Sequence, residues 1–294
     1  MEIRVSIPAD NEGYTGRECP VCKKYFKIKF GTGLPNSSSC HCPYCNHIGS
    51  QQEFWTKQQI EYARSIALHN VSNQLLQSLK QLEMAPRHDQ LFSIGISVSG
   101  SPTPIVYYSE IELEQKIVCQ NCTLAYTIYG VFGYCPDCGI HNSKQITDTN
   151  FSLILNMLDL PFKEVTAVIS EKIVENALED IVSTFDAFGR EWASKLKMDL
   201  SFQNIEKARK KLVNEIDFNI ADGIDLAEWN FIVEQFQKRH LLAHKMGVID
   251  DAYIKNTGAD YSMIGRKVVI KTDEVKRLIK DLNIISSNLF KHAN

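Results

Sequence analysis

The sequence lacks several features that define large classes of protein. Its 294 residues hold no run of about 18 apolar residues, which excludes a membrane-spanning helix, and charges interrupt the few apolar residues at the N-terminus. The net charge is only −3, so the chain as a whole is not a polycation that coats nucleic acid. A hydrophobic fraction of 44% excludes a disordered or fibrous chain. We therefore expect a folded, cytoplasmic protein with no membrane partner.

Cysteine is absent after Cys138. All nine cysteines lie in the first half of the chain, from Cys19 to Cys138. Eight of them form four Cys-x-x-Cys pairs, with 19 residues between the first two pairs and 12 between the last two. This spacing aims two thiolates at one ion, and a reducing compartment disfavours disulfides. Two closed structural Zn(II) sites are predicted, without a coordination position for a catalytic water; disulfides and an iron–sulfur centre are the alternatives. The predicted ligands are Cys19, Cys22, Cys42 and Cys45 in one site and Cys119, Cys122, Cys135 and Cys138 in the other.

One cysteine is left over. Cys40 and His41 directly precede Cys42, and either could replace it as a ligand. A Cys-Pro-x-Cys pair has the better local geometry, so we interpret Cys40 as a spare thiol.

Hydrophobic periodicity divides the rest of the chain. A near-helical period without Pro or Gly predicts a long amphipathic helix over 54–84, ended by Pro86, and two strands are predicted at 91–98 and 105–113. From about Phe151 onward the pattern is helical. The predicted fold class is α+β: two small β zinc modules with a connecting helix, followed by an all-α bundle. The predicted domains are 1–50, 51–87, 88–145 and 146–294.

Each cysteine module resembles a zinc ribbon, a small β-hairpin fold clamped between two Cys-x-x-Cys pairs. In the first module, alternation along a strand from Lys23 to Phe30 gives one cationic face and one apolar face that includes Phe30. The cationic face is suited to phosphates and an unpaired base, and the alternative is a solvated strand face. Its predicted RNA contacts are Lys23, Tyr25, Lys27 and Lys29.

The second module has aromatic residues but no cation between Lys116 and Lys144. It is therefore a poor phosphate binder, and we expect it to pack against another domain or a protein partner.

In the helical half, Asp225 to Glu228 is typical of a capping box that opens a helix closed by Gly247. A helical projection from Trp229 places His240 in the apolar stripe, with Arg239 and His244 on opposite edges. A histidine in such a stripe is expected to be a hydrogen-bonded core residue. A metal site of His240 and His244 is the weaker alternative, because no third ligand is indicated.

The motif Arg239-x4-His244, late in a helical bundle, resembles the Arg-x(4–6)-His signature of HEPN domains. The resemblance covers roughly 162–294 and implies a metal-independent endoribonuclease that acts as a dimer of helical halves. By this resemblance His244 would transfer protons, Arg239 would hold the scissile phosphate, and His240 would orient them or contact RNA. Attack by an RNA 2′-hydroxyl would leave a 2′,3′-cyclic phosphate, without a catalytic cofactor. Members of this family often serve in toxin-like or antiviral defence.

A preceding basic run could line the RNA path, although such a run is usually a solvated face. Its residues are Lys207, Arg209, Lys210 and Lys211.

Two other functions stay open. One is a non-catalytic, zinc-stabilised module that dimerises and binds RNA, nucleotide or protein. The other, a DNA-binding regulator, is disfavoured because no basic recognition helix is evident.

Overall fold

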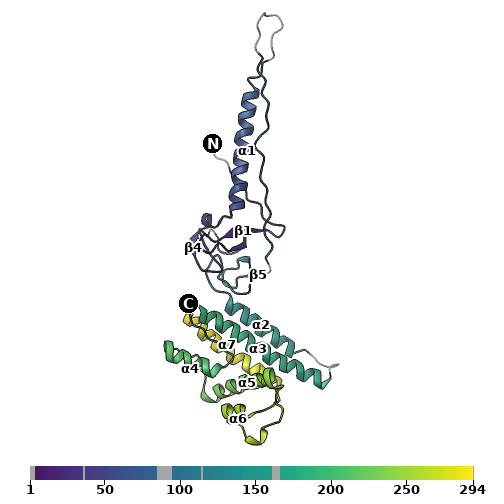
Figure 1. The fold of residues 1–294 in the computed structure, drawn as a ribbon, viewed down its shortest axis with the longest axis vertical. Coiled ribbons are helices and arrows are strands. Elements are labelled where there is room, and N and C mark those ends of the chain that lie inside the picture. Colours follow the sequence, from purple (N-terminus) through teal and green to yellow (C-terminus); the bar gives the residue numbers. More distant parts are fainter. Residues whose placement is uncertain (1–3, 36, 85–94, 114, 161–165, 294) are drawn as a thin grey trace, which may run out of the picture. The chain divides into compact units, whose positions relative to one another are not determined.

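The computed structural model describes residues 4–35, 37–84, 95–113, 115–160 and 166–293. It divides the chain into two compact units, unit 1 from Met1 to His141 and unit 2 from Asn142 to Asn294. Unit 1 combines short antiparallel strands with one long helix, and unit 2 is helical (Figure 1). The predicted α+β class is confirmed at this coarse level.

A four-stranded antiparallel sheet joins the two cysteine modules. The first module supplies β1 (Tyr14–Glu18) and β2 (Tyr25–Lys29), and the second supplies β5 (Gln115–Val118) and β6 (Ala125–Ile128). The strand order is β1-β2-β6-β5, with Lys27 opposite Thr127 where β2 pairs with β6. Pairing satisfies the backbone groups that a free edge strand would expose.

The predicted separation into domains 1–50 and 88–145 is therefore wrong, because both modules share this sheet and one apolar cluster. The cluster includes Phe26 and Ile28 from β2, Tyr126 and Ile128 from β6, and Phe54. Phe54 ends a short 3₁₀ helix, η1 (Gln51–Phe54), which follows a second hairpin of β3 (Ser39–His41) and β4 (Ile48–Ser50). The second module was expected to pack against a domain or partner, and within unit 1 it packs against the first module.

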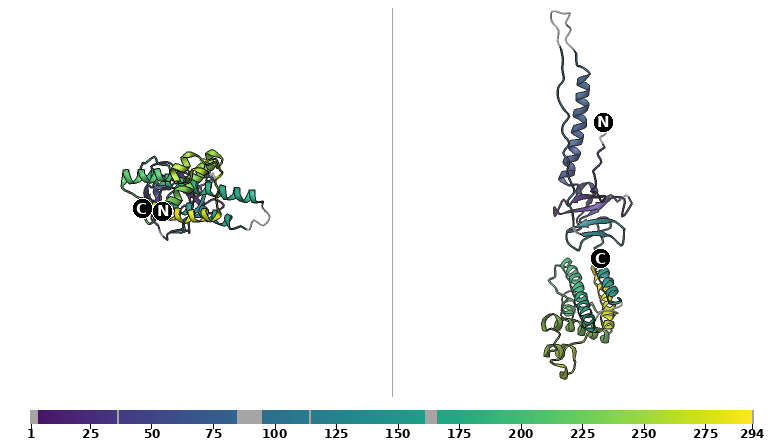
Figure 2. Two further views of the ribbon diagram at one scale, coloured as in Figure 1. Left: turned by 90° about the horizontal axis from the view of Figure 1, so that it is seen from below. Right: turned by 90° about the vertical axis from the view of Figure 1, so that its right-hand side faces the viewer.

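The long helix predicted over 54–84 is present as α1 (Lys57–Lys80). Thr56 caps it: its hydroxyl accepts a hydrogen bond from the Gln59 amide, and the Gln59 side chain accepts one in return from the Thr56 amide. The helix ends at Lys80, and Pro86 lies outside the described residues. Residues 95–113 run back alongside α1 (Figures 1 and 2).

The two strands predicted beside α1 are not formed among the described residues. Ile96 makes only an isolated bridge with Met84, and residues 91–94 of the first predicted strand lie outside the described part. Over 105–113 no strand is present. The returning chain instead donates backbone hydrogen bonds to helix side chains: Thr103 to Ser72 at 2.9 Å and Val106 to Ser65 at 3.0 Å. Side chains of α1 thus accept backbone hydrogen bonds that a neighbouring strand would accept in a sheet.

Unit 2 packs its helices around a single large apolar cluster. Phe185 lies at its centre, with its ring edge-on to Phe202 and Phe236. A smaller cluster around Ile249 and Tyr253 lies at the end of α5. The helices are α2 (Ser143–Leu158), α3 (Ala167–Lys195), α4 (Ile205–Ile216), α5 (Leu226–Lys245), α6 (Asp251–Thr257) and α7 (Thr272–Ala293), with a 3₁₀ turn, η2 (Tyr261–Met263).

The helix that carries the Arg-x4-His motif begins and ends as predicted. The Asp225 carboxylate accepts a hydrogen bond from the Glu228 amide, and Gly247 follows Met246, the left-handed residue that ends α5. Only half of the predicted capping box forms, because the Glu228 side chain binds Arg277. In the described part of the chain, every helix is too short or too polar to span a membrane.

Candidate functional site

The first cysteine cluster has the dimensions of a tetrahedral thiolate site. Cys19, Cys22, Cys42 and Cys45 have sulfurs within 4.8 Å of one another. Two of the Sγ–Sγ distances are 3.7 Å (Cys19–Cys45) and 3.6 Å (Cys22–Cys42). Four sulfurs at about 2.3 Å from a Zn(II) ion in a tetrahedron lie about 3.8 Å apart. The four thiolates therefore fit one metal ion.

The second cluster repeats this geometry with Cys119, Cys122, Cys135 and Cys138, whose sulfurs also lie within 4.8 Å of one another. Its Sγ–Sγ distances are 3.7 Å between Cys119 and Cys138 and 3.4 Å between Cys122 and Cys135. Both sets of predicted ligands are thus brought together, as expected for two structural metal sites.

All four Cys-x-x-Cys turns have the same backbone. In each, the amide of the residue after the second cysteine bonds to the carbonyl of the first cysteine, at 2.9 to 3.0 Å. That following residue has a positive φ in every case. Glycine and asparagine adopt this conformation most readily, so only two of the four positions signal it in the sequence. The residues are Lys23, Asn46, Thr123 and Gly139.

Cys40 lies outside both clusters, as predicted. Its side chain is fully buried, and burial raises the pKa of the thiol to about 12 despite the nearby Arg17. The thiol donates a weak hydrogen bond to the His41 carbonyl at 3.8 Å. Cys40 is therefore a protonated core residue.

The predicted cationic face of the first module is largely covered. Lys27 is only 5% exposed, and its ammonium is 2.6 Å from the Asp10 carboxylate. The Tyr25 hydroxyl donates to Glu110, a residue 85 positions away, and burial together with this bond raises the Tyr25 pKa. The expectation that Lys27 and Tyr25 present themselves to RNA is wrong, because distant carboxylates pack over them.

The remaining residues of this face behave differently. Lys23 is exposed in the first Cys-x-x-Cys turn, and Lys29 is half-buried with its ammonium 5.5 Å from the Tyr14 ring. Phe30, expected on the buried side, is 57% exposed and contacts the Arg17 guanidinium. Of the predicted RNA contacts on this face, only Lys23 and Lys29 remain accessible, and Lys24, outside that set, is exposed as well.

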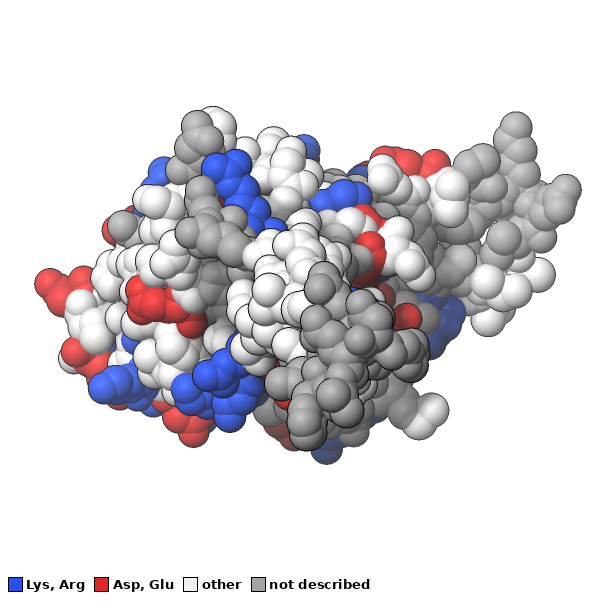
Figure 3. Space-filling view, turned by 90° about the horizontal axis from the view of Figure 1, so that it is seen from above, with Lys and Arg blue, Asp and Glu red and all other residues white. Residues whose placement is uncertain are grey.

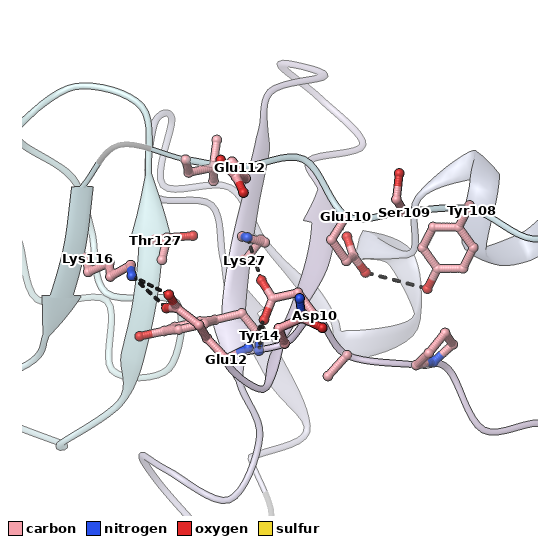
Figure 4. Close-up of a pocket in the computed structure, with 14 residues that line it drawn as sticks. Asp10, Glu12, Tyr14, Lys27, Tyr108, Ser109, Glu110, Glu112, Lys116 and Thr127 are labelled. Carbon is pink, nitrogen blue, oxygen red and sulfur yellow. Dashed lines mark hydrogen bonds and ion pairs between the residues drawn. The ribbon is translucent and has the colours of Figure 1, made fainter.

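Lys27, alone of the four predicted RNA contacts on that face, lines a polar cavity of about 560 Å³ (Figure 4). Its cations are paired: Lys27 with Asp10, and Lys116 with Glu12 at 2.6 Å. Two further glutamates, Glu110 and Glu112, bring the lining to four carboxylates against two lysines. This excess of negative charge opposes phosphate binding. On the face of the molecule shown in Figure 3, acidic and basic side chains are likewise interspersed.

The C-terminal end of α5 presents two histidines side by side. The rings of His240 and His244 have centroids 4.7 Å apart, and both side chains are exposed. Partial burial of the ring and the neighbouring His244 lower the pKa of His240, more than Asp250 raises it. His240 therefore remains neutral to a lower pH than an isolated histidine.

Arg239 precedes this pair and is half-buried. Its Nε is buried and has no hydrogen-bond partner among the described residues. The adjacent cation Lys238 differs, because it is buried and 3.1 Å from both Glu234 and Glu274. The Arg239 guanidinium is thus uncommitted to any described carboxylate, which leaves it available to an anion.

The expectation that His240 lies in the core is wrong, and the cause is a rotation of the buried face along α5. The first turns bury Trp229, Ile232 and Phe236 in the main cluster, as predicted. The last turns bury Leu241 against α6 in the small cluster, on a different side of the helix. A single apolar stripe cannot describe a helix that packs on two clusters, and the change of side turns His240 outward.

The basic run on α4 is mostly engaged within unit 2. Arg209 bonds to Asn219 at 2.9 Å and stacks on Trp229, while Lys210 pairs with Glu206 at 3.2 Å. Lys211 donates to the Asp199 carbonyl at 2.9 Å. Lys207 alone of the four is exposed without a described side-chain partner. The run is a solvated helix face with one free cation in the described structure.

Comparison of the chain with protein-family models, with curated proteins and with solved structures found no match. The candidate sites therefore depend on their own geometry: two Cys₄ groups able to hold metal, and an exposed histidine pair beside an uncommitted arginine.

Proposed function

We propose that the protein is a zinc-stabilised RNA-binding protein whose helical unit cleaves RNA without a catalytic metal. The observation that carries the proposal is the exposed His240–His244 pair, with ring centroids 4.7 Å apart, next to Arg239. Two adjacent imidazoles and one guanidinium are the groups that transfer of an RNA phosphoryl group to its own 2′-hydroxyl requires.

Each group has a distinct role in this proposal. His240, with its lowered pKa, accepts the proton of the 2′-hydroxyl as its oxygen attacks the adjacent phosphorus. His244 donates a proton to the departing 5′-oxygen, so that a 2′,3′-cyclic phosphate and a 5′-hydroxyl result. Arg239 binds the phosphoryl oxygens, and its planar guanidinium suits this task better than an ammonium would.

The two Cys₄ clusters would hold Zn(II) and build structure. Four thiolates fill a tetrahedral coordination shell and leave no position for water, so these sites would not hydrolyse a substrate. A symmetric pair of helical units would place two copies of each group in one cleft, which would complete an otherwise sparse site.

The test is cleavage of mixed cellular RNA by purified wild-type protein in EDTA, with detection of 2′,3′-cyclic phosphate ends. We expect Arg239→Ala and His244→Ala to lower the rate at least about 100-fold, the lower end of the effect of removing a charge-stabilising donor or an acid–base group. Arg266→Ala, which removes an exposed arginine elsewhere in unit 2, is the matched control and should retain activity.

Circular dichroism and zinc content would show that the variants are folded. Cleavage that persists in both purified variants would refute the assignment. RNA binding by the wild-type protein without any cyclic phosphate product would instead support a non-catalytic binding module.

A further inference from the structure

Helix α1 carries an open apolar stripe. Its members are 38% to 61% exposed, although they are large aliphatic side chains on a 24-residue helix. At 100° per residue all of them lie within about 60° of Leu75, so they form one line along the helix, which the exposed Arg64 interrupts between Ile60 and Leu68. We call this line the α1 seam; it consists of Ile60, Leu68, Val71, Leu75, Leu79 and, in the turn after the helix, Leu82.

The described part of the neighbouring chain in unit 1 leaves the members of the seam exposed. Residues 95–113 contact a different side of α1, where Ser65, His69 and Ser72 accept or share hydrogen bonds with the returning backbone. These three residues project between about 60° and 120° from Leu75, all in the same direction around the helix. That side of α1 also carries Tyr62, whose ring centroid lies 5.6 Å from that of Tyr108, whereas the members of the seam remain exposed.

The seam has the spacing of a helix–helix interface. Steps of 3, 4, 4 and 3 residues separate Leu68, Val71, Leu75, Leu79 and Leu82. Steps of 3 and 4 keep apolar side chains facing one partner helix, and an 11-residue repeat does so with a right-handed supercoil. From Ile60 to Leu82 the seam is about 33 Å long at 1.5 Å per residue.

We propose that the α1 seam binds a second copy of this chain in an antiparallel, two-fold arrangement centred on Val71. The seam is nearly palindromic about that residue. Ile60 and Leu82 lie 11 positions before and after it, and Leu68 and Leu75 lie 3 before and 4 after. An antiparallel copy therefore places apolar residues opposite apolar residues along most of the interface.

Charge favours the same partner and the same direction. No Asp, Glu, Lys or Arg occurs from Ser65 to Leu79, so two copies can meet there without burying like charges. Arg64 lies within the seam, and a parallel pair would press two Arg64 guanidinium groups together. The antiparallel pair moves them about 20 Å apart at 1.5 Å per residue and brings Lys57 of one copy near Glu83 of the other.

The experiment is sedimentation of the full-length, metal-loaded protein over a range of concentrations. Val71→Glu places two carboxylates at the two-fold axis and should raise the dissociation constant at least about 100-fold, because apposed like charges cost several kcal/mol. At a protein concentration between the two dissociation constants, the observed mass of the particle should then fall. Gln77→Glu adds the same charge on an exposed side of α1 away from the seam and should leave the mass unchanged.

A photo-crosslinking amino acid in place of Leu82 tests the direction of pairing. Attachment to a peptide that contains Ile60 of another chain supports the antiparallel arrangement, and attachment to the peptide around residue 82 of another chain overturns it. Equal dissociation constants for the wild-type protein and Val71→Glu, or a wild-type protein that is monomeric throughout, would overturn the interface itself. Because α1 lies in unit 1, none of these outcomes depends on RNA cleavage by unit 2.

Discussion

The two units bury their apolar residues in different ways. Among the described residues, the cluster of unit 1 has 13 buried members, six of them cysteines, whereas the main cluster of unit 2 has 28 and no cysteine. In unit 1 most side chains that would hold metal also fill the core. We therefore expect the core of unit 1 to form only when metal binds. The stability of unit 2 comes instead from the burial of its apolar helix faces.

Removal of metal should have the largest effect on this comparison, because it should destabilise unit 1 and not unit 2. Structural Zn(II) contributes about 10–16 kcal/mol of apparent binding free energy in small zinc peptides, far more than a small core supplies. We expect a strong chelator to unfold unit 1 and to leave the helices of unit 2 in place. Limited proteolysis should then cut residues 4–141 first, while far-UV circular dichroism keeps most of the helical signal.

The control for this experiment is chelator saturated with Zn(II) before addition. If chelated protein gave the same proteolytic pattern as the metal-loaded protein, the core of unit 1 would not depend on metal.

The reverse perturbation is a cavity in the core of unit 2. Phe185 is fully buried between Phe202 and Phe236, so Phe185→Ala should lower the free energy of unfolding of unit 2 by about 3–5 kcal/mol. Urea denaturation measures the loss, and metal content should remain at two ions per chain. Val168→Ala, an exposed change on the same helix, should have little effect; an equal loss in both variants would contradict this assignment of the core.

The smallest expected effect concerns pH. Burial and the nearby Glu228 carboxylate raise the pKa of Asp281 to about 7, and one of its carboxylate oxygens is buried without a described partner. A carboxyl with a raised pKa binds its proton more tightly in the folded state. Its contribution to stability is therefore lost as the pH rises from about 4 to 7.

Asp281→Asn should flatten that part of the pH dependence of unit 2 and stabilise it modestly above pH 7. Thermal denaturation at several pH values measures this, with Asp180→Asn, at an exposed position of α3, as the control. An unchanged pH profile in Asp281→Asn would show that this carboxyl does not titrate in the window.

Prediction from sequence succeeded where the determinants are local. A Cys-x-x-Cys turn fixes its own geometry over four residues, and the cap at Asp225 acts over three, so the metal ligands and the start of α5 were predictable. Prediction failed where partners lie far away in the chain. Nothing near Lys27 indicates Asp10 as its partner, nor Thr127 as its neighbour across the sheet.

The histidine pair shows a third case. The periodicity of α5 was identified correctly over its first turns, but the helix leaves one cluster and packs on another. The change of side depends on where α6 docks, which is a tertiary property. The α1 seam is similar: its spacing is visible in the sequence, but only the structure shows that its side chains are exposed.

The pairing of β2 with β6 also imposes an order in time. The four cysteines of the first cluster leave the ribosome long before Thr127, so that cluster can load metal while β2 still lacks its neighbour. Closing the loop of about 100 residues between Lys27 and Thr127 costs roughly 4 kcal/mol of chain entropy, which the sheet can repay only at the end of unit 1 synthesis. We therefore expect the nascent first module to carry a bare, aggregation-prone strand edge until the second module arrives to cover it.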